Sequence, residues 1–367
     1  MPDDVSFTDI YVDDAIVDRV SDVLDSQRYV KGPALETFEQ RFADACGTDH
    51  AVGLSSGTAA LLLSLQAAGI GDDDDVFVPG HTFYASVSPI LELDANPVFV
   101  DIDPSTYTID TDSLTEAIEA ADAPEAVVPV HLYGQMAAMD DISALAAEYD
   151  VTVVEDACQA HFAERDGETA GTVGDAGAFS FYPSKNMTVA GDGGMLVTDR
   201  DDIAERACQL RNHGRDETGT HQTLGLNYRM DETNAAVGIE QLKQVQDWNH
   251  QRNAAAQQYT DRLSDIEPVI TPTAADDGLH VYHLYVIQVP AVDRDDLRTF
   301  LDDHGIETGI HYETPAHQHP SVADRITDVS LPETERLCDR IISLPMHPRL
   351  TDADIDHVCT TIERFFE

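Results

Sequence analysis

Short apolar runs, each followed by a stretch with helical spacing, place the strongest constraint on the fold of this chain. The runs are rich in β-branched residues and occupy residues 51–54, 76–78, 97–100, 126–130 and 151–154. Strands that alternate with helices imply βαβ units, in which neighbouring strands are parallel and helices cover the sheet. The sequence therefore predicts an α/β fold with a mostly parallel sheet flanked by helices.

The C-terminal third has a different pattern. Residues 231–263 keep helical spacing with few breakers and predict one long helix, which is followed by a strand at 285–289 and a helix at 294–303. A chain of 367 residues is long enough for two domains. We expect a large domain over residues 1–245 and a smaller C-terminal α+β domain over residues 246–367.

The charge is strongly negative: 69 acidic residues face 21 basic ones, and only three of the latter are lysines. With 42% hydrophobic residues the chain should still fold. Such self-repulsion is relieved at molar salt, where the screening length falls to about 3 Å. Loss of lysine with retention of arginine favours adaptation to a high-salt cytoplasm over an acidic protein that repels nucleic acid in ordinary salt. A nucleic-acid partner is disfavoured in both cases.

Other sequence features predict a cytoplasmic protein without a membrane or metal partner. We find no long apolar run and no signal-peptide pattern. The five cysteines are odd in number, widely spaced and without a Cys-x-x-Cys pair, as expected of reduced thiols. The pair His317 and His319 has no fixed carboxylate or cysteine partner, so we expect no metal site there.

Lys185 is the first candidate for chemistry. It lies between a strand-like run that ends at Ser180 and the glycine-rich stretch 191–194. A lysine in an apolar or cationic site has a lowered pKa and can form an imine with an aldehyde. The alternative is an ordinary surface lysine, which the general depletion of lysine disfavours.

Two strand ends supply further candidates. Residues 55–60 lead from a strand into a helix, an arrangement that points unpaired backbone N–H groups and the positive end of the helix dipole at one spot and suits phosphate. A purely structural helix cap explains that motif equally well. Asp156 follows the strand 151–154, where ligands bind in open α/β sheets, and its carboxylate could keep a pyridinium nitrogen protonated. A helix cap is again the alternative.

Taken together, these stretches resemble the DegT/StrS group of sugar aminotransferases, which are fold type I pyridoxal-phosphate enzymes of the aspartate aminotransferase superfamily. The resemblance extends over nearly the whole chain. The matching segments are residues 29–33, 55–61, 79–83, 155–161, 174–198, 227–230, 309–312 and 344–347.

The resemblance implies pyridoxal 5'-phosphate as the cofactor, with Lys185 as the residue that forms the imine and moves protons. It assigns Asp156 to the pyridine nitrogen, Gln159 to the ring hydroxyl and Phe83 to stacking on the ring. The phosphate would be held by Gly57, Thr58 and Ser180, and by Asn227 of a neighbouring subunit, which implies a homodimer with shared active sites. Facing the substrate would be Arg229, His311 and Tyr312.

By the same resemblance, the expected reaction moves an amino group from L-glutamate to a keto group of a nucleotide-linked sugar by a ping-pong mechanism, in amino-sugar and polysaccharide biosynthesis. A keto-inositol aminotransferase and a pyridoxal-phosphate sugar dehydratase remain alternatives. Some relatives that dehydrate sugars carry His at the lysine position, so Lys185 favours transamination. A non-catalytic regulator is disfavoured, because a binder needs neither Lys185 nor its electronic partner Asp156.

Overall fold

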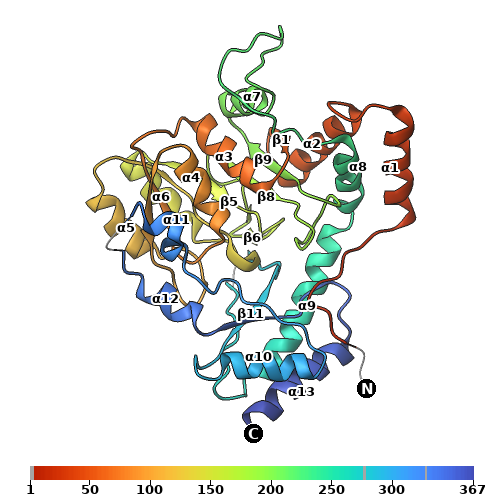
Figure 1. The fold of residues 1–367 in the computed structure, drawn as a ribbon, viewed down its shortest axis with the longest axis vertical. Coiled ribbons are helices and arrows are strands. Elements are labelled where there is room, and N and C mark those ends of the chain that lie inside the picture. The colour runs from red at the N-terminus through yellow and green to blue at the C-terminus, as the bar shows by residue number, and fades with distance from the viewer. Residues whose placement is uncertain (1–3, 276–277, 327–328) are drawn as a thin grey trace.

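The computed structural model describes residues 4–275, 278–326 and 329–367 (Figure 1). Its strands are β1 (His50–Leu54), β2 (Asp75–Pro79), β3 (Asn96–Val100), β4 (Pro124–Val127), β5 (Thr152–Asp156), β6 (Glu164–Arg165), β7 (Glu168–Thr169), β8 (Ala176–Ser180), β9 (Gly194–Thr198), β10 (Gly278–Leu279), β11 (Tyr285–Gln288) and β12 (Ile341–Leu344). Its α-helices are α1 (Asp14–Ser26), α2 (Pro33–Cys46), α3 (Gly57–Ala68), α4 (Ser88–Glu92), α5 (Thr111–Ala120), α6 (Met139–Tyr149), α7 (Asp201–Leu210), α8 (Glu232–Gln241), α9 (Val245–Leu263), α10 (Arg294–Asp303), α11 (Pro320–Ala323), α12 (Pro332–Cys338) and α13 (Asp352–Phe366). Short 3-10 helices are η1 (Tyr84–Ser86), η2 (Leu132–Gly134) and η3 (Ala316–Gln318).

The central sheet has seven strands in the order β1-β9-β8-β5-β4-β2-β3. The strands from β8 to β3 are parallel to one another, and β9 runs antiparallel to both of its neighbours. All five predicted strands are present, although β4 ends at Val127 and β5 extends to Asp156. The predicted mostly parallel sheet, with helices on both faces, is confirmed.

Alternating side chains of the strands feed two cores, one on each face of the sheet. In β2, Phe77 packs with residues of α2, α5, α6 and α8, whereas Val76 and Val78 pack with residues of α3, α4 and α7. Because neighbouring residues of a strand point to opposite faces, a sheet covered on both sides needs apolar residues at nearly every position. The uninterrupted apolar runs of the sequence have this physical origin.

The single long helix predicted over residues 231–263 is wrong in one respect. The structure divides it into α8 and α9, with a tight turn at residues 242–244. The backbone N–H groups of Lys243 and Gln244 donate to carbonyls three residues back, at 3.2 and 2.9 Å, instead of four. This turn contains neither Gly nor Pro, so the sequence carries no local signal of the break.

The C-terminal part has a core of its own, formed by α9, α10, α13 and the antiparallel pair β11 and β12. Figure 1 shows α9 running from the helices beside the sheet down to α10 and α13. The N-terminal segment joins this part, because Val5 N–H donates to the Gly305 carbonyl at 2.8 Å. The strand and helix predicted at 285–289 and 294–303 are present as β11 and α10. Division into domains at residues 245 and 246 stays a prediction.

Three observations concern partners. Within the described part of the chain, no helix combines the length and the apolar character that crossing a membrane requires. The same residues contain no group of three or more His, Cys, Asp or Glu side chains arranged to hold a metal ion. All five cysteines are free thiols.

Candidate active site

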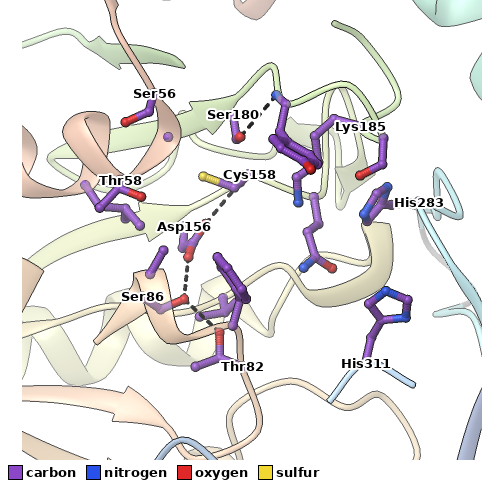
Figure 2. A pocket seen from close by; sticks show the side chains of 18 of the residues that line it. Ser56, Thr58, Thr82, Ser86, Asp156, Cys158, Ser180, Lys185, His283 and His311 are labelled. Carbon is purple, nitrogen blue, oxygen red and sulfur yellow. Dashed lines mark hydrogen bonds between the residues drawn. The ribbon is translucent and has the colours of Figure 1, made fainter. Parts of the chain in front are cut away.

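A cavity of about 470 Å³ opens beyond the carboxyl ends of β5 and β8, which end at Asp156 and Ser180. This is the edge at which open α/β sheets bind ligands. In Figure 2, Ser56, Thr58 and Cys158 lie on one side of the cavity and His283 and His311 on the other. The residues predicted from the sequence that line it are Gly57, Thr58, Phe83, Asp156, Gln159, Ser180, Lys185, His311 and Tyr312.

The first turn of α3 forms the end of the cavity that suits an anion. The Ser56 hydroxyl caps the helix by accepting from Ala59 N–H at 3.1 Å, while the N–H groups of Gly57 and Thr58 belong to the first turn and have no carbonyl partner within the helix. A Cβ at Gly57 would lie 2.6 Å from Ser180 Cβ. Glycine therefore keeps the helix start close to the Ser180 hydroxyl, and the two N–H groups and this hydroxyl are suited to hold a phosphate.

Asp156 is fixed by donors behind it. Its carboxylate accepts a hydrogen bond from Ser86 Oγ at 2.7 Å and one from Cys158 N–H at 3.1 Å. Ser86 donates its only hydroxyl proton to the carboxylate. In the 2.7 Å bond between the hydroxyls of Thr82 and Ser86, Thr82 is therefore the donor. Ser86 lies in η1, and no motif in the sequence marked it as part of the site.

Lys185 follows β8 in a loop, where its backbone N–H donates to the Tyr182 carbonyl at 2.8 Å. The next residue, Asn186, is buried and donates to Asn249 Oδ1 and to the Val281 carbonyl, both at 2.9 Å. Burial lowers the pKa of the Lys185 amine, and the nearby Cys158 and Asp156 act in the opposite direction. The amine is thereby shifted toward the neutral form, which is the nucleophilic one.

The amide of Gln159 has a defined orientation. Its Oε1 accepts from Tyr133 N–H at 2.9 Å, and its Nε2 donates to the Tyr312 hydroxyl at 2.9 Å. The Phe83 ring lies 5.6 Å from the Tyr312 ring, centroid to centroid, and 54% of Phe83 is exposed. An aromatic face is therefore free to stack on a planar ligand.

Two histidines complete the far side of the cavity. Burial, with Lys185 nearby, lowers the pKa of His311 to about 4 and holds that of His283 well below its usual value. Both imidazoles are therefore neutral at physiological pH. His311 Nδ1 lies 2.8 Å from the Ser343 hydroxyl, whereas His283 Nδ1 is buried with no hydrogen-bond partner among the described residues. His283 was not predicted, because a histidine within an apolar strand-like stretch gives no catalytic signal.

The remaining two predicted residues lie elsewhere. Asn227 is exposed, and Arg229 donates to Asn212 Oδ1 at 2.9 Å in a separate hollow of about 460 Å³. That hollow is also lined by Lys31 and Arg215. Neither predicted residue lines the cavity that holds Lys185 in the same chain.

Comparison with known proteins decides the family, because residues 11–363 match the DegT/DnrJ/EryC1/StrS aminotransferase family. The chain belongs to this family. Among its relatives is dTDP-3-amino-3,4,6-trideoxy-α-D-glucose transaminase of Streptomyces venezuelae, 41% identical over 332 residues that cover 90% of this chain and 86% of the relative. Another is UDP-N-acetyl-3-dehydro-α-D-glucosamine 3-aminotransferase of Acidithiobacillus ferrooxidans, 38% identical over 353 residues that cover 96% of this chain and 94% of the relative.

Solved structures of the DegT/DnrJ/EryC1/StrS family agree in fold. The S. venezuelae protein DesV, in complex with a ketimine intermediate, is 38% identical and superposes with a TM-score of 0.95, covering 100% of this chain and 99% of DesV. A further solved relative holds pyridoxamine phosphate as its bound cofactor. The protein is a fold type I aminotransferase, and pyridoxal phosphate is its cofactor.

The cavity fits this cofactor on observations of its own. The cradle at the start of α3 provides backbone N–H donors and the Ser180 hydroxyl for a phosphate, and a side chain at position 57 would fill it. Asp156, on the same cavity, can accept from a ring nitrogen, and Lys185 can meet an aldehyde. The cavity therefore presents the hydrogen-bond donors, the carboxylate and the amine that a phosphorylated pyridine aldehyde requires.

Proposed function

We propose that this aminotransferase moves an amino group from L-glutamate to a keto group of a nucleotide-linked sugar. The observation that carries the proposal is the opening of Lys185, Asp156 and the start of α3 onto one cavity. The printed activities of the relatives, on dTDP- and UDP-linked sugars, support a nucleotide-sugar acceptor. Glutamate as the donor rests on the family resemblance.

The chemistry divides between the cofactor and the chain. When bound, pyridoxal phosphate supplies an aldehyde that forms a Schiff base with an amine, and a ring that accepts electrons from Cα. Lys185 Nζ then serves as the base that takes the proton from Cα of the amino donor and later returns one to the sugar. Asp156 would hold the ring nitrogen protonated, and Gln159 would contact the ring hydroxyl.

Three further contacts position the reacting groups. The N–H groups of Gly57 and Thr58 and the Ser180 hydroxyl would bind the phosphate, and Phe83 would cover one face of the ring. His311 and Tyr312 would face the sugar. Exclusion of water on that side would come from these rings and from neutral His283.

We also propose a homodimer in which Asn227 and Arg229 serve the cavity of the neighbouring subunit. The segment that carries them also carries Leu224 and Leu226, which are 83% and 53% exposed. Large apolar side chains on an exposed loop are typical of an interface. A second copy of the chain would cover them and bring the Arg229 hollow toward the site.

A keto-inositol aminotransferase or a sugar dehydratase would use the same cofactor contacts. The substrates consumed and the products formed distinguish the three reactions. Only dehydration removes a sugar hydroxyl without consuming glutamate, and only a cyclitol aminotransferase accepts a ketone that lacks a nucleotide. Retention of Lys185 beside Asp156 speaks against a non-catalytic regulator.

The test is spectroscopic and chemical. The purified protein with pyridoxal phosphate should show a visible absorption band that L-glutamate bleaches, with release of 2-oxoglutarate, and initial-rate plots with both substrates should be parallel. The Lys185→Ala variant should show neither the bleaching nor the keto acid. A wild-type band that glutamate leaves unchanged would rule out glutamate as donor, and intersecting plots would contradict the ping-pong mechanism.

The acidic surface supports a high-salt cytoplasm as the setting of this activity. With 69 acidic and 21 basic residues, self-repulsion should weaken the folded state in dilute buffer. Unfolding by urea at increasing KCl should therefore give rising midpoints up to molar salt. A protein most stable in dilute buffer would contradict halophilic adaptation.

A further inference from the structure

A strained turn lies behind the cavity at Tyr133 and Gly134, in η2. Tyr133 has a φ of 57°, in the left-handed region that bulky residues avoid at a cost of about 1–2 kcal/mol. Gly134 has a φ of 104°, and a Cβ there would lie 2.9 Å from the backbone nitrogens of Tyr282 and His283. The turn is thus pressed against the segment that carries His283. Such a conformation persists only where surrounding contacts hold it.

Tyr133 contacts two different parts of the site. Its backbone N–H donates to Gln159 Oε1 at 2.9 Å, which turns Gln159 Nε2 toward the Tyr312 hydroxyl. Its own hydroxyl donates to the carbonyl of His311, the residue before Tyr312. One buried residue therefore touches both Gln159 and the segment that brings Tyr312 to it.

The donor and acceptor roles in the row of hydrogen bonds through the Tyr133 hydroxyl can be assigned in only one way. A carbonyl can only accept, so Tyr133 donates to His311 and must accept from His81 Nε2, which lies 2.7 Å away. His81 is then neutral with its proton on Nε2, in agreement with burial that lowers its pKa to about 4. Its Nδ1 is left to accept from the Cys338 thiol, 3.6 Å away.

The bond from the Tyr133 hydroxyl gives the backbone of the His311 segment a link to the sheet side, in addition to the side-chain bond between Gln159 and Tyr312. The other hydrogen bonds of residues 309–311 go to Ser343 of β12: Gly309 N–H donates to its carbonyl at 3.1 Å, and His311 Nδ1 lies 2.8 Å from its hydroxyl. Those bonds fix the segment to the C-terminal part. The Tyr133 hydroxyl fixes it to the side of the sheet that carries Asp156 and Gln159.

We propose that Tyr133 is a positioning residue that uses its N–H to orient Gln159 and its hydroxyl to seat Tyr312, so that the Gln159 amide is held ready for the cofactor ring. The inference rests on the proposed contact of Gln159 with the ring hydroxyl. Tyr133 itself does not line the cavity. It acts through the two side chains that do.

The test compares two removals of a buried tyrosine hydroxyl. Tyr133→Phe keeps the ring and its left-handed backbone but loses both the bond to the His311 carbonyl and the bond from His81 Nε2. Tyr107→Phe is the matched control, because the Tyr107 ring lies 5.3 Å from that of Tyr133, centroid to centroid. Among the residues that the structure describes, the Tyr107 hydroxyl bonds only to Gln288 Nε2, at 3.1 Å. Both variants should fold.

The first readout needs no cofactor. In the cofactor-free full chain, hydrogen exchange of the peptide spanning residues 306–316 should be about fivefold faster in Tyr133→Phe than in wild type, the change for one net hydrogen bond of ~1 kcal/mol. Tyr107→Phe should leave that peptide unchanged. Equal exchange in the two variants would overturn the seating of Tyr312 by Tyr133.

The second readout is the affinity for pyridoxal phosphate, measured by quenching of protein fluorescence. Tyr133→Phe should weaken binding about fivefold, and this loss should vanish when Tyr312 is already Phe, because the two changes break the same path. Additive losses, or a Tyr133→Phe affinity equal to that of Tyr107→Phe, would overturn the positioning role. Failure of the wild type to bind the cofactor would instead refute the proposed site, and the inference with it.

Discussion

Replacement of Gly57 by Ala should weaken cofactor binding sharply while leaving the chain folded. A Cβ at this position would lie 2.6 Å from Ser180 Cβ and 3.0 Å from Cys158 Sγ. Carbon atoms in contact are ~3.5–4.0 Å apart, so the start of α3 must shift by about 1 Å. Ser180 Cβ is attached directly to the backbone of β8 and cannot rotate away. The helix start is therefore the part that gives.

The shift has a calculable effect on phosphate binding. Moving the N–H groups of Gly57 and Thr58 by about 1 Å takes them from ~2.9 Å to beyond hydrogen-bonding distance of a phosphate oxygen. Loss of one hydrogen bond to a charged group costs about 1.5–3 kcal/mol. We therefore expect the dissociation constant of pyridoxal phosphate to rise about 10- to 100-fold.

The assay is a fluorescence titration of cofactor-free protein with pyridoxal phosphate, with circular dichroism to verify folding. Gly71→Ala is the matched control, because a Cβ at Gly71 meets no atom within 4 Å. That variant should bind as wild type does. A folded Gly57→Ala protein with an affinity within twofold of wild type would refute the phosphate cradle at the start of α3.

Burial lowers the pKa of the Lys185 amine below 10.5, so this amine loses its proton at a lower pH than a free lysine does. The rate at which the visible band forms with pyridoxal phosphate should therefore rise with pH, with a midpoint below 10.5. A midpoint at or above that value would contradict the lowered pKa. Glu232→Gln should lower the free energy of unfolding by about 1.5–3 kcal/mol in urea titrations. The reason is that the buried carboxylate accepts hydrogen bonds from three backbone N–H groups at the start of α2. An unchanged urea midpoint would show that the glutamine amide accepts these bonds equally well. Leu226→Asp should shift the protein toward monomer in sedimentation at fixed concentration, and an undisturbed assembly would remove this loop from the interface.

The sequence was sufficient for the parts of the fold that periodicity encodes. Both faces of the sheet are covered, so its strands appear as continuous apolar runs. Asp156 was recognisable because it lies two residues after the end of the run 151–154. Gly57 and Lys185 were recognisable for a related reason. Each lies where a strand passes into a turn, and the topology of parallel strands brings such turns together at one edge.

The contacts that the sequence did not reveal join residues that are distant in the chain. Ser86 reaches Asp156 across 70 positions, and Tyr133 reaches His311 across 178. Serine and tyrosine are common residues, and neither the 3-10 turn of Ser86 nor the left-handed φ of Tyr133 has a local signature. The break between α8 and α9 likewise arises from the tight turn at residues 242–244. These features depend on the assembled structure.

The net charge of −48 opposes the approach of an anionic cofactor. Surface charges contribute little to phosphate binding when they lie farther from the phosphate than the screening length, which is about 8 Å at ~0.15 M salt and about 3 Å at the molar salt proposed above. Within the cavity, the start of α3 presents backbone donors and Lys185 a nitrogen, and the carboxylates that line it are Asp156 and Asp192. Asp156 has a partner role in the same proposal. The acidic surface should therefore affect how fast the cofactor approaches, while the α3 cradle decides how tightly it is held.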